Sequence, residues 1–184
     1  MAARRRLIAG FDTETTGLEN EDRVIEFATS LMDIDTGDFV YRYEQRFNSG
    51  GQPIHPKALA VHHIHPADIA GCPDFSVCIP TFNKIATICP IWLAHNSEFD
   101  LRMLAAEFNR LSLPMPKLTV LDSMTEGRWA TPNGKSPNLG ELCFALGVPY
   151  DPALAHNALY DVEILLKAWY EGYRRGFFHY PEVS

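Results

Sequence analysis

The stretch Leu7-Ile8-Ala9-Gly10-Phe11-Asp12-Thr13-Glu14-Thr15-Thr16-Gly17-Leu18 decides how this chain folds. Its first half is an apolar run typical of a buried strand, and Thr-Thr-Gly predicts a turn after it. Side chains alternate between the two faces of a strand, so Asp12 and Glu14 are expected to point the same way. Paired carboxylates there are costly to keep ionised without a cation, and hard divalent metals take oxygen ligands. A bare Asp-x-Glu taken alone is more often an ordinary pair of turn acids.

Four further segments have the pattern of strands. They cover residues 24–32, 39–47, 91–94 and 118–121, and Asp35-Thr36-Gly37-Asp38 is a hairpin signal between the first two. The opening third therefore predicts an antiparallel meander of three strands. Beyond it, strands alternate with helical patterns at residues 75–88, 97–111 and 158–176. The predicted fold is an α/β domain with a mixed five-stranded sheet flanked by helices.

Capping signals set the ends of the later helices. Ser97 is expected to cap the helix that contains Asp100. Asn138 and Glu141 fit a capping box, and Gly147 is expected to end that helix. Shorter helices or turns are predicted at residues 57–64 and from residue 66, and residues 129–137 are expected to form a polar loop.

Length and composition favour one ordinary globular domain over residues 1–184, with a core from about residue 6 to 176. The formal net charge is −7, which argues against a protein that binds nucleic acid through bulk positive charge. The four cysteines form no C-x-x-C pair, and we expect reduced thiols in a cytoplasmic protein. No apolar run is long enough to span a membrane.

Two later motifs carry acids at the start of helices. Asp100 follows the short strand-like segment 91–94 in Ala94-His95-Asn96-Ser97-Glu98-Phe99-Asp100, and His156-x4-Asp161 opens the last helix. Each acid alone is equally well explained by the helix dipole. Sites in open α/β sheets nevertheless gather at strand ends, and a histidine is the natural general base near neutral pH.

Together these residues resemble the motifs of the DEDDh 3′→5′ exonucleases. The segments Phe11–Leu18, Ala94–Asp100 and His156–Asp161 are similar to the family's three motifs, and Leu59-Ala60-Val61-His62 resembles its substrate-lining segment. The likeness covers about residues 6–175. It is greatest to the proofreading subunit of bacterial replicative polymerases and to the exonuclease X type. The sister DEDDy group has Tyr where this chain has Asn157, so His156 is where the DEDDh base belongs.

The resemblance implies a ribonuclease H-like fold and phosphodiester hydrolysis with two divalent ions, Mg²⁺ or Mn²⁺. Asp12 would bridge the ions, Glu14 and Asp161 would complete the first site, and Asp100 would hold the second. His156 would take the proton from the attacking water. The products would be nucleoside 5′-monophosphates released from a free 3′ end, most naturally of single-stranded DNA.

The family likeness also implies a set of residues around the terminal nucleotide. Those residues are Thr13, Thr15, Gly17, Leu18, Val61, His62, Asn96 and Phe99. For Leu18, Val61 and Phe99, plain packing is an equal alternative. Arg102 and Lys135 could touch the strand backbone, although a solvated surface position is the default for both.

Several alternatives stay open at this point. A 3′→5′ exoribonuclease of the same family and a proofreading subunit within a polymerase complex both fit the motifs. The short segment after Gly176 favours a stand-alone nuclease without a C-terminal tether to a polymerase. A zinc site is a weaker alternative, built from His62, His63, His65, Cys72 and Cys78 at spacings that match no usual zinc finger. A binding module that has lost activity is disfavoured, because all five catalytic-type residues are present.

Overall fold

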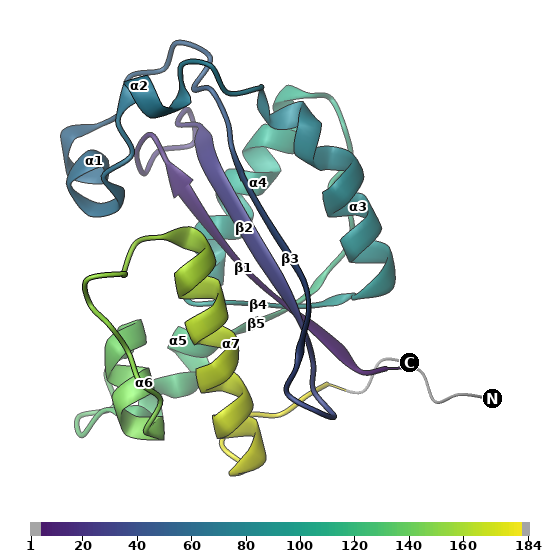
Figure 1. The fold of residues 1–184 in the computed structure, drawn as a ribbon, viewed down its shortest axis with the longest axis vertical. Helices are drawn as coiled ribbons and strands as arrows, with labels where there is room; N and C mark the ends of the chain where they lie inside the picture. The colour runs from purple at the N-terminus through teal and green to yellow at the C-terminus, as the bar shows by residue number, and fades with distance from the viewer. Residues whose placement is uncertain (1–4, 182–184) are drawn as a thin grey trace.

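The computed structural model describes residues 5–181 and contains one mixed five-stranded sheet (Figure 1). The strands are β1 (Leu7–Thr15), β2 (Val24–Asp33), β3 (Phe39–Arg46), β4 (Ile91–Ala94) and β5 (Thr119–Asp122). Their order across the sheet is β3-β2-β1-β4-β5. The pairs β1–β2 and β2–β3 are antiparallel, and β1–β4 and β4–β5 are parallel. The predicted meander of three antiparallel strands and the predicted mixed five-stranded sheet are confirmed.

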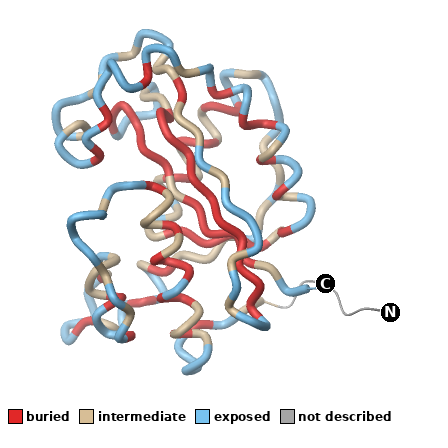
Figure 2. Tube along the Cα trace, viewed as in Figure 1, coloured by how far each residue is buried: buried red, intermediate tan, exposed pale blue. Residues whose placement is uncertain are grey.

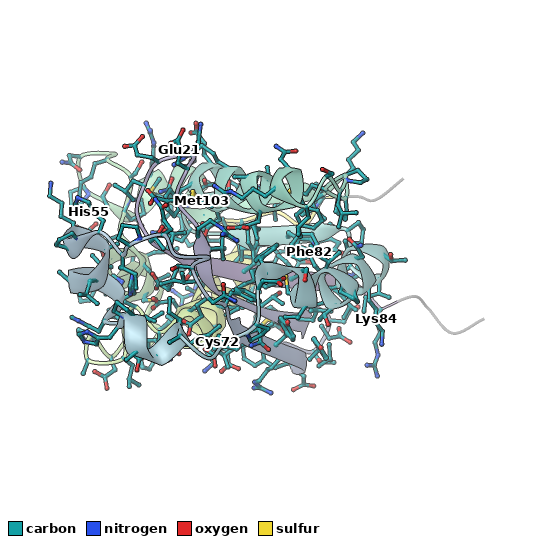
Figure 3. All side chains as sticks on the ribbon, turned by 90° about the horizontal axis from the view of Figure 1, so that it is seen from above. Glu21, His55, Cys72, Phe82, Lys84 and Met103 are labelled. Atoms are coloured by element: carbon teal, nitrogen blue, oxygen red, sulfur yellow. The ribbon has the colours of Figure 1, made fainter. Side chains whose placement is uncertain are left out.

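Helices cover both faces of this sheet. The longer ones are α3 (Ile79–Ile88), α4 (Ser97–Arg110), α6 (Leu139–Leu146) and α7 (Ala158–Arg174). The short ones are α1 (Pro56–His62), α2 (Pro66–Ile69), η1 (Phe75–Cys78), α5 (Ser123–Glu126) and η2 (Gly127–Ala130). One apolar core lies between the sheet and α6–α7, and a second lies between the sheet and α3–α4. Figure 3 labels Phe82 and Met103, which belong to the second core, and Lys84, which points outward from α3.

The central strand β1 contributes alternate residues to the two cores. Ile8 packs in the core under α6–α7, whereas Ala9 and Phe11 pack in the core under α3–α4. Gly10 lies beneath α7, where an added Cβ would come within 2.7 Å of Leu166 Cγ. The same alternation puts Asp12 on the α7 side of the sheet.

The edge strand β3 is far less covered than its neighbours. Every residue of β2 is buried, while β3 is mostly exposed or half-buried (Figure 2). Its exposed positions include Arg42 and Glu44. Charged side chains of this kind discourage pairing of an edge strand with another chain.

Most capping predictions hold, and one is wrong. Asn138 and Glu141 form the expected capping box, and Gly147 ends α6 in the left-handed conformation with φ 69°. The cap of α4 is not Ser97 but Asn96, which has φ 88°. Ser97 is the first helical residue, and its N–H and Oγ both donate to Asp122 Oδ2, at 2.8 and 3.0 Å.

Two further details differ from the expectation. Residues 129–130, expected in a loop, belong to η2, and α5 precedes it. These one-turn helices are too short to show a hydrophobic period. The last helix ends at Arg174, two residues before the expected limit. No helix within residues 5–181 has the length and hydrophobicity needed to cross a bilayer.

Candidate active site

Three distant parts of the chain bring their acids into one pocket. Asp12 and Glu14 come from the end of β1, Asp100 from the first turn of α4, and Asp161 from the first turn of α7. The pocket has a volume of about 330 Å³. It is lined by Asp12, Thr13, Glu14, Leu18, Val61, His95, Asn96, Phe99, Asp100, His156 and Asp161. The convergence of the four acids and His156 that the motifs predict is therefore present.

Asp100 is held in place by the strand beside it. The backbone N–H and the hydroxyl of Thr13 both donate to Asp100 Oδ1, at 3.0 and 2.6 Å. Thr13 is on the face of β1 opposite to Asp12, so it joins the first acid motif to the second. Asp100 is 3% exposed, and burial raises the pKa of its carboxyl to about 7.

Asp161 has one oxygen bonded and one without a partner. The backbone N–H of His156 donates to Asp161 Oδ2 at 2.8 Å. Asp161 Oδ1 is buried and accepts no hydrogen bond from residues 5–181. A buried carboxylate oxygen in this condition is costly unless a cation or water meets it. This oxygen is therefore free to act as a ligand to a cation.

The acids also oppose one another's ionisation. Burial, followed by the charges of Asp100, Glu14 and Asp161, raises the pKa of Asp12 well above its ordinary value. Burial, followed by the charge of Glu26, raises the pKa of Glu14 to about 8. Burial also raises the pKa of Asp161. Raised carboxyl pKa values mean that the cluster needs either protons or cations.

The donor set is one that a divalent cation prefers, because it consists of carboxylate oxygens. Among residues 5–181, no three His, Cys, Asp or Glu side chains are grouped so that they could hold an ion as they stand. The acids therefore share a pocket without their oxygens lying around a single point.

His156 lies on the loop that leads into α7. It is exposed, has φ 64°, and lines the acid pocket. It also lines a neighbouring pocket of about 450 Å³ together with Asp12 and Asp161. His156 therefore combines an exposed loop position with access to the acid pocket.

A larger pocket of about 710 Å³ adjoins the acids and contains the remaining predicted residues. Thr15, Gly17 and His62 line it, together with Thr13, Leu18, Val61 and Phe99. Asn96 lines only the acid pocket among the three described here. The apolar side chains Leu18 and Val61 are 68% and 44% exposed. Plain core packing does not explain these two residues.

His62 supports the wall of this larger pocket. Its Nδ1 accepts the N–H of Ile64 at 2.9 Å, which leaves Nε2–H to donate to Thr15 O at 3.2 Å. Burial lowers the pKa of the imidazole, so the ring stays neutral. The bond to Thr15 ties α1 to the end of β1.

Gly17 has a packing reason that the motif alone does not reveal. A Cβ at this position would overlap the carboxylate of Asp22. That carboxylate accepts from Thr16 Oγ1 and from the N–H of Glu19, each at 2.9 Å. Only glycine allows Asp22 to reach back and close the turn.

The zinc alternative is contradicted by this geometry. Both ring nitrogens of His62 are already bonded, and Cys78 is packed in the core under α3–α4. Burial raises the pKa of the Cys78 thiol to about 12, which disfavours the thiolate that zinc needs.

Sequence reasoning gave no role to His95 and took a surface position as the default for Arg102. His95 lines both smaller pockets, with its ring nitrogens 2.9 Å from Ser123 Oγ and 3.0 Å from Pro137 O. Arg102 is half-buried and donates to the turn after β1. No local signal could find either, since their partners lie 28 to 84 residues away in sequence. Lys135 pairs with Glu141, as a solvated surface lysine would.

Comparison with known proteins gives one family and several relatives. The sequence profile of the RNase_T family, described as exonuclease, matches residues 9–169. DNA polymerase III subunit epsilon of Haemophilus influenzae is 30% identical over 162 residues, which are 84% of this chain and 62% of that protein. The chain spans 10%, 12% and 62% of the lengths of the first three curated relatives that it matches.

Solved structures give the same result for the fold. Exonuclease X in complex with 5′ overhanging duplex DNA superposes with a TM-score of 0.69 at 26% identity, over 92% of this chain and 93% of that one. The nuclease domain of 3′hExo, a DEDDh family member bound to rAMP, gives 0.77 at 14% identity over 96% of each chain. The second likeness concerns the fold alone. The predicted α/β architecture is that of these nucleases.

Proposed function

This chain belongs to the exonuclease family, and from that premise we propose that it acts as a single domain that removes nucleotides from the 3′ end of nucleic acid. The observation that carries the proposal is the meeting of Asp12, Glu14, Asp100, Asp161 and His156 in one pocket. Their order along the chain fits the DEDDh pattern, with the acids in β1, α4 and α7 and His156 on the loop before α7. The proposed products are nucleoside 5′-monophosphates.

We propose that Asp12, Glu14, Asp100 and Asp161 hold two divalent ions, Mg²⁺ or Mn²⁺. The orphaned Asp161 Oδ1 and the raised pKa values of Asp12, Glu14 and Asp100 support this assignment. When bound, such ions lower the pKa of a coordinated water and stabilise the charge that develops on the phosphate. Thr13 keeps Asp100 in position for this task.

His156 is proposed as the general base. Its loop position at the mouth of the acid pocket leaves the imidazole open to solvent, to which it can pass a proton. The hydrogen bond from its backbone to Asp161 fixes the loop relative to the acids. A positioned base of this kind is worth roughly 10²–10⁴ in rate.

The larger pocket is proposed to take the 3′-terminal nucleotide. Leu18, Val61 and Phe99 offer apolar surface to a base, and Thr13, Thr15 and Gly17 line the same pocket as the acid Glu14. Stacking against side chains of this kind tolerates any base. The pocket volume of about 710 Å³ leaves room for either a purine or a pyrimidine.

The proposed substrate is single-stranded DNA. The DNA-bound exonuclease X structure and the epsilon subunit favour DNA. RNA is the second candidate, because discrimination between the two sugars depends on the fit around the 2′-position. The similarity to an epsilon subunit also makes a polymerase complex a candidate setting. A protein partner would then bind outside the pockets described above.

The test is digestion of 5′-labelled oligomers with Mg²⁺ or Mn²⁺, against EDTA as the metal-free control. Linear single-stranded DNA should give a descending ladder, and circular single strands should survive. Cutting of circles, or early release of the label as a mononucleotide, would contradict the 3′ polarity. A parallel RNA ladder of equal rate would replace the DNA assignment with a dual one.

A further inference from the structure

The turn that carries Leu18 is held at its tip by one arginine. Arg102 on α4 donates from Nη2 to Leu18 O at 2.9 Å and from Nη1 to Asn20 Oδ1 at 2.8 Å. The two bonds use a single planar guanidinium, which gives them fixed relative directions. Leu18 itself is 68% exposed, so little packing restrains its side chain.

The same guanidinium also lies against a second residue that lines the larger pocket. Its central carbon lies 5.4 Å from the ring centroid of Phe99, one helical turn earlier. Leu18 and Phe99 both line the acid pocket and the larger pocket. Arg102 lines none of the three pockets described above. It therefore stands behind two pocket residues without facing the pocket.

The base of the turn has separate anchors. Arg110 Nη2 donates to Asn20 O at 2.7 Å and to Asp22 O at 2.9 Å. Glu107 is 1% exposed and accepts from Arg23 and Arg110. Loss of Arg102 should thus free the carbonyl of Leu18 and the side chain of Asn20, while the rest of the turn stays attached.

We propose that Arg102 is a positioning residue, which sets Leu18 against Phe99 as a preformed slot for the 3′-terminal base. The inference rests on the proposed function and adds a residue outside the acid pocket to it. A slot ordered in advance costs the bound base less entropy than one that must order on binding. The competing account is that Arg102 touches a phosphate of the strand directly.

Arg102→Lys separates the two accounts, because lysine keeps the charge and loses the planar fork. With single-stranded DNA, Arg102→Lys and Arg102→Gln should both raise KM about tenfold, because the turn loses at least one of its two hydrogen bonds to the guanidinium. The kcat should stay within about twofold of the wild-type value. Neither variant should change the dependence of binding on salt. Arg174→Lys, at the far end of α7, is the matched control and should behave as wild type.

A second arm tests the route through Leu18. In a Leu18→Ala background, Arg102→Lys should add less than about twofold to KM, because the side chain it positions is gone. A direct phosphate contact predicts instead that Arg102→Lys has a near-wild-type KM. It also predicts that the slope of log binding constant against log salt concentration is lowered by about 0.7 in Arg102→Gln. The effects of Arg102 substitutions on KM would then add to the effect of Leu18→Ala. Any of those three results would overturn the positioning role. Wild-type protein without 3′ nuclease activity would overturn the proposed function itself, a separate outcome.

Discussion

Removal of the Glu107 carboxylate should destabilise the protein by about 3 kcal/mol. Glu107 Oε1 accepts from Arg23 Nε, Val24 N and Arg110 Nη1 at 2.8, 3.1 and 3.0 Å, and Oε2 accepts from Arg23 Nη2 at 3.1 Å. Glu107→Ala leaves two guanidinium groups and a backbone N–H without this acceptor. Breaking a fully buried ion pair from one side costs roughly 3–5 kcal/mol. The side chains of Arg23 and Arg110 are 21% and 30% exposed, so water can solvate them in the variant. The expected destabilisation is therefore at the lower end of that range.

Urea denaturation followed by circular dichroism measures this change, and thermal melting should show a fall of roughly 6–12 °C. Glu171→Ala is the matched control. Glu171 also accepts from two arginines, Arg174 and Arg175, but these side chains are 63% and 46% exposed. Exposed pairs of this kind are worth about 0–1 kcal/mol. The two Glu→Ala substitutions therefore remove the same atoms in buried and exposed settings.

A difference between the two variants smaller than about 1 kcal/mol would refute the reasoning, because Glu107 is buried and also accepts the buried N–H of Val24, whereas Glu171 has neither feature. An unchanged slope of free energy against urea is needed for the comparison, since a changed slope would mean a changed denatured state.

Three further predictions concern the acids and His156. In EDTA, the carboxyls of Glu14 and Asp100, with pKa values of about 8 and 7 in the folded protein, keep protons that an unfolded chain loses near pH 4. The free energy of unfolding should therefore fall as the pH rises from about 4 to 8. Constant stability by denaturant titration across that interval would contradict the raised pKa values. Added Mn²⁺ should raise the melting temperature of wild type and much less that of Asp12→Asn, and equal rises would count against a site built on Asp12. His156→Ala should lower kcat by roughly 10²–10⁴ while the rise in melting temperature with Mn²⁺ stays unchanged; near-wild-type turnover would exclude it as the base.

Local signals explain why most of the fold could be predicted. The apolar run of β1, the hairpin signal before β3, and the Asn138–Glu141 capping box each lie within a dozen residues of the structure they specify. Ser97 was assigned wrongly because its acceptor, Asp122, lies 25 residues later in the chain. Sequence spacing alone cannot reveal a cap supplied by another strand.

In the candidate site too, some residues could be predicted from local sequence and others could not. The convergence of Asp12, Asp100 and Asp161 could be expected, since each lies at a strand end or in the first turn of a helix. The residues that hold the site in position, Arg102 and Thr13, could not be predicted in this way. Arg102 reaches Leu18 across 84 residues, and Thr13 reaches Asp100 across 87. Such pairs are set by how α4 packs against the sheet, which no single segment of sequence encodes.

The wide spacing of the acids along the chain has a consequence for biosynthesis. β1 and β2 can pair as soon as they are made, but the last acid, Asp161, belongs to α7. At roughly 5–20 residues per second, the ribosome needs on the order of ten seconds or more between Asp12 and Asp161. A nascent chain therefore carries an incomplete set of acids throughout that interval. The pocket that gathers the four acids is therefore complete only after synthesis has passed α7.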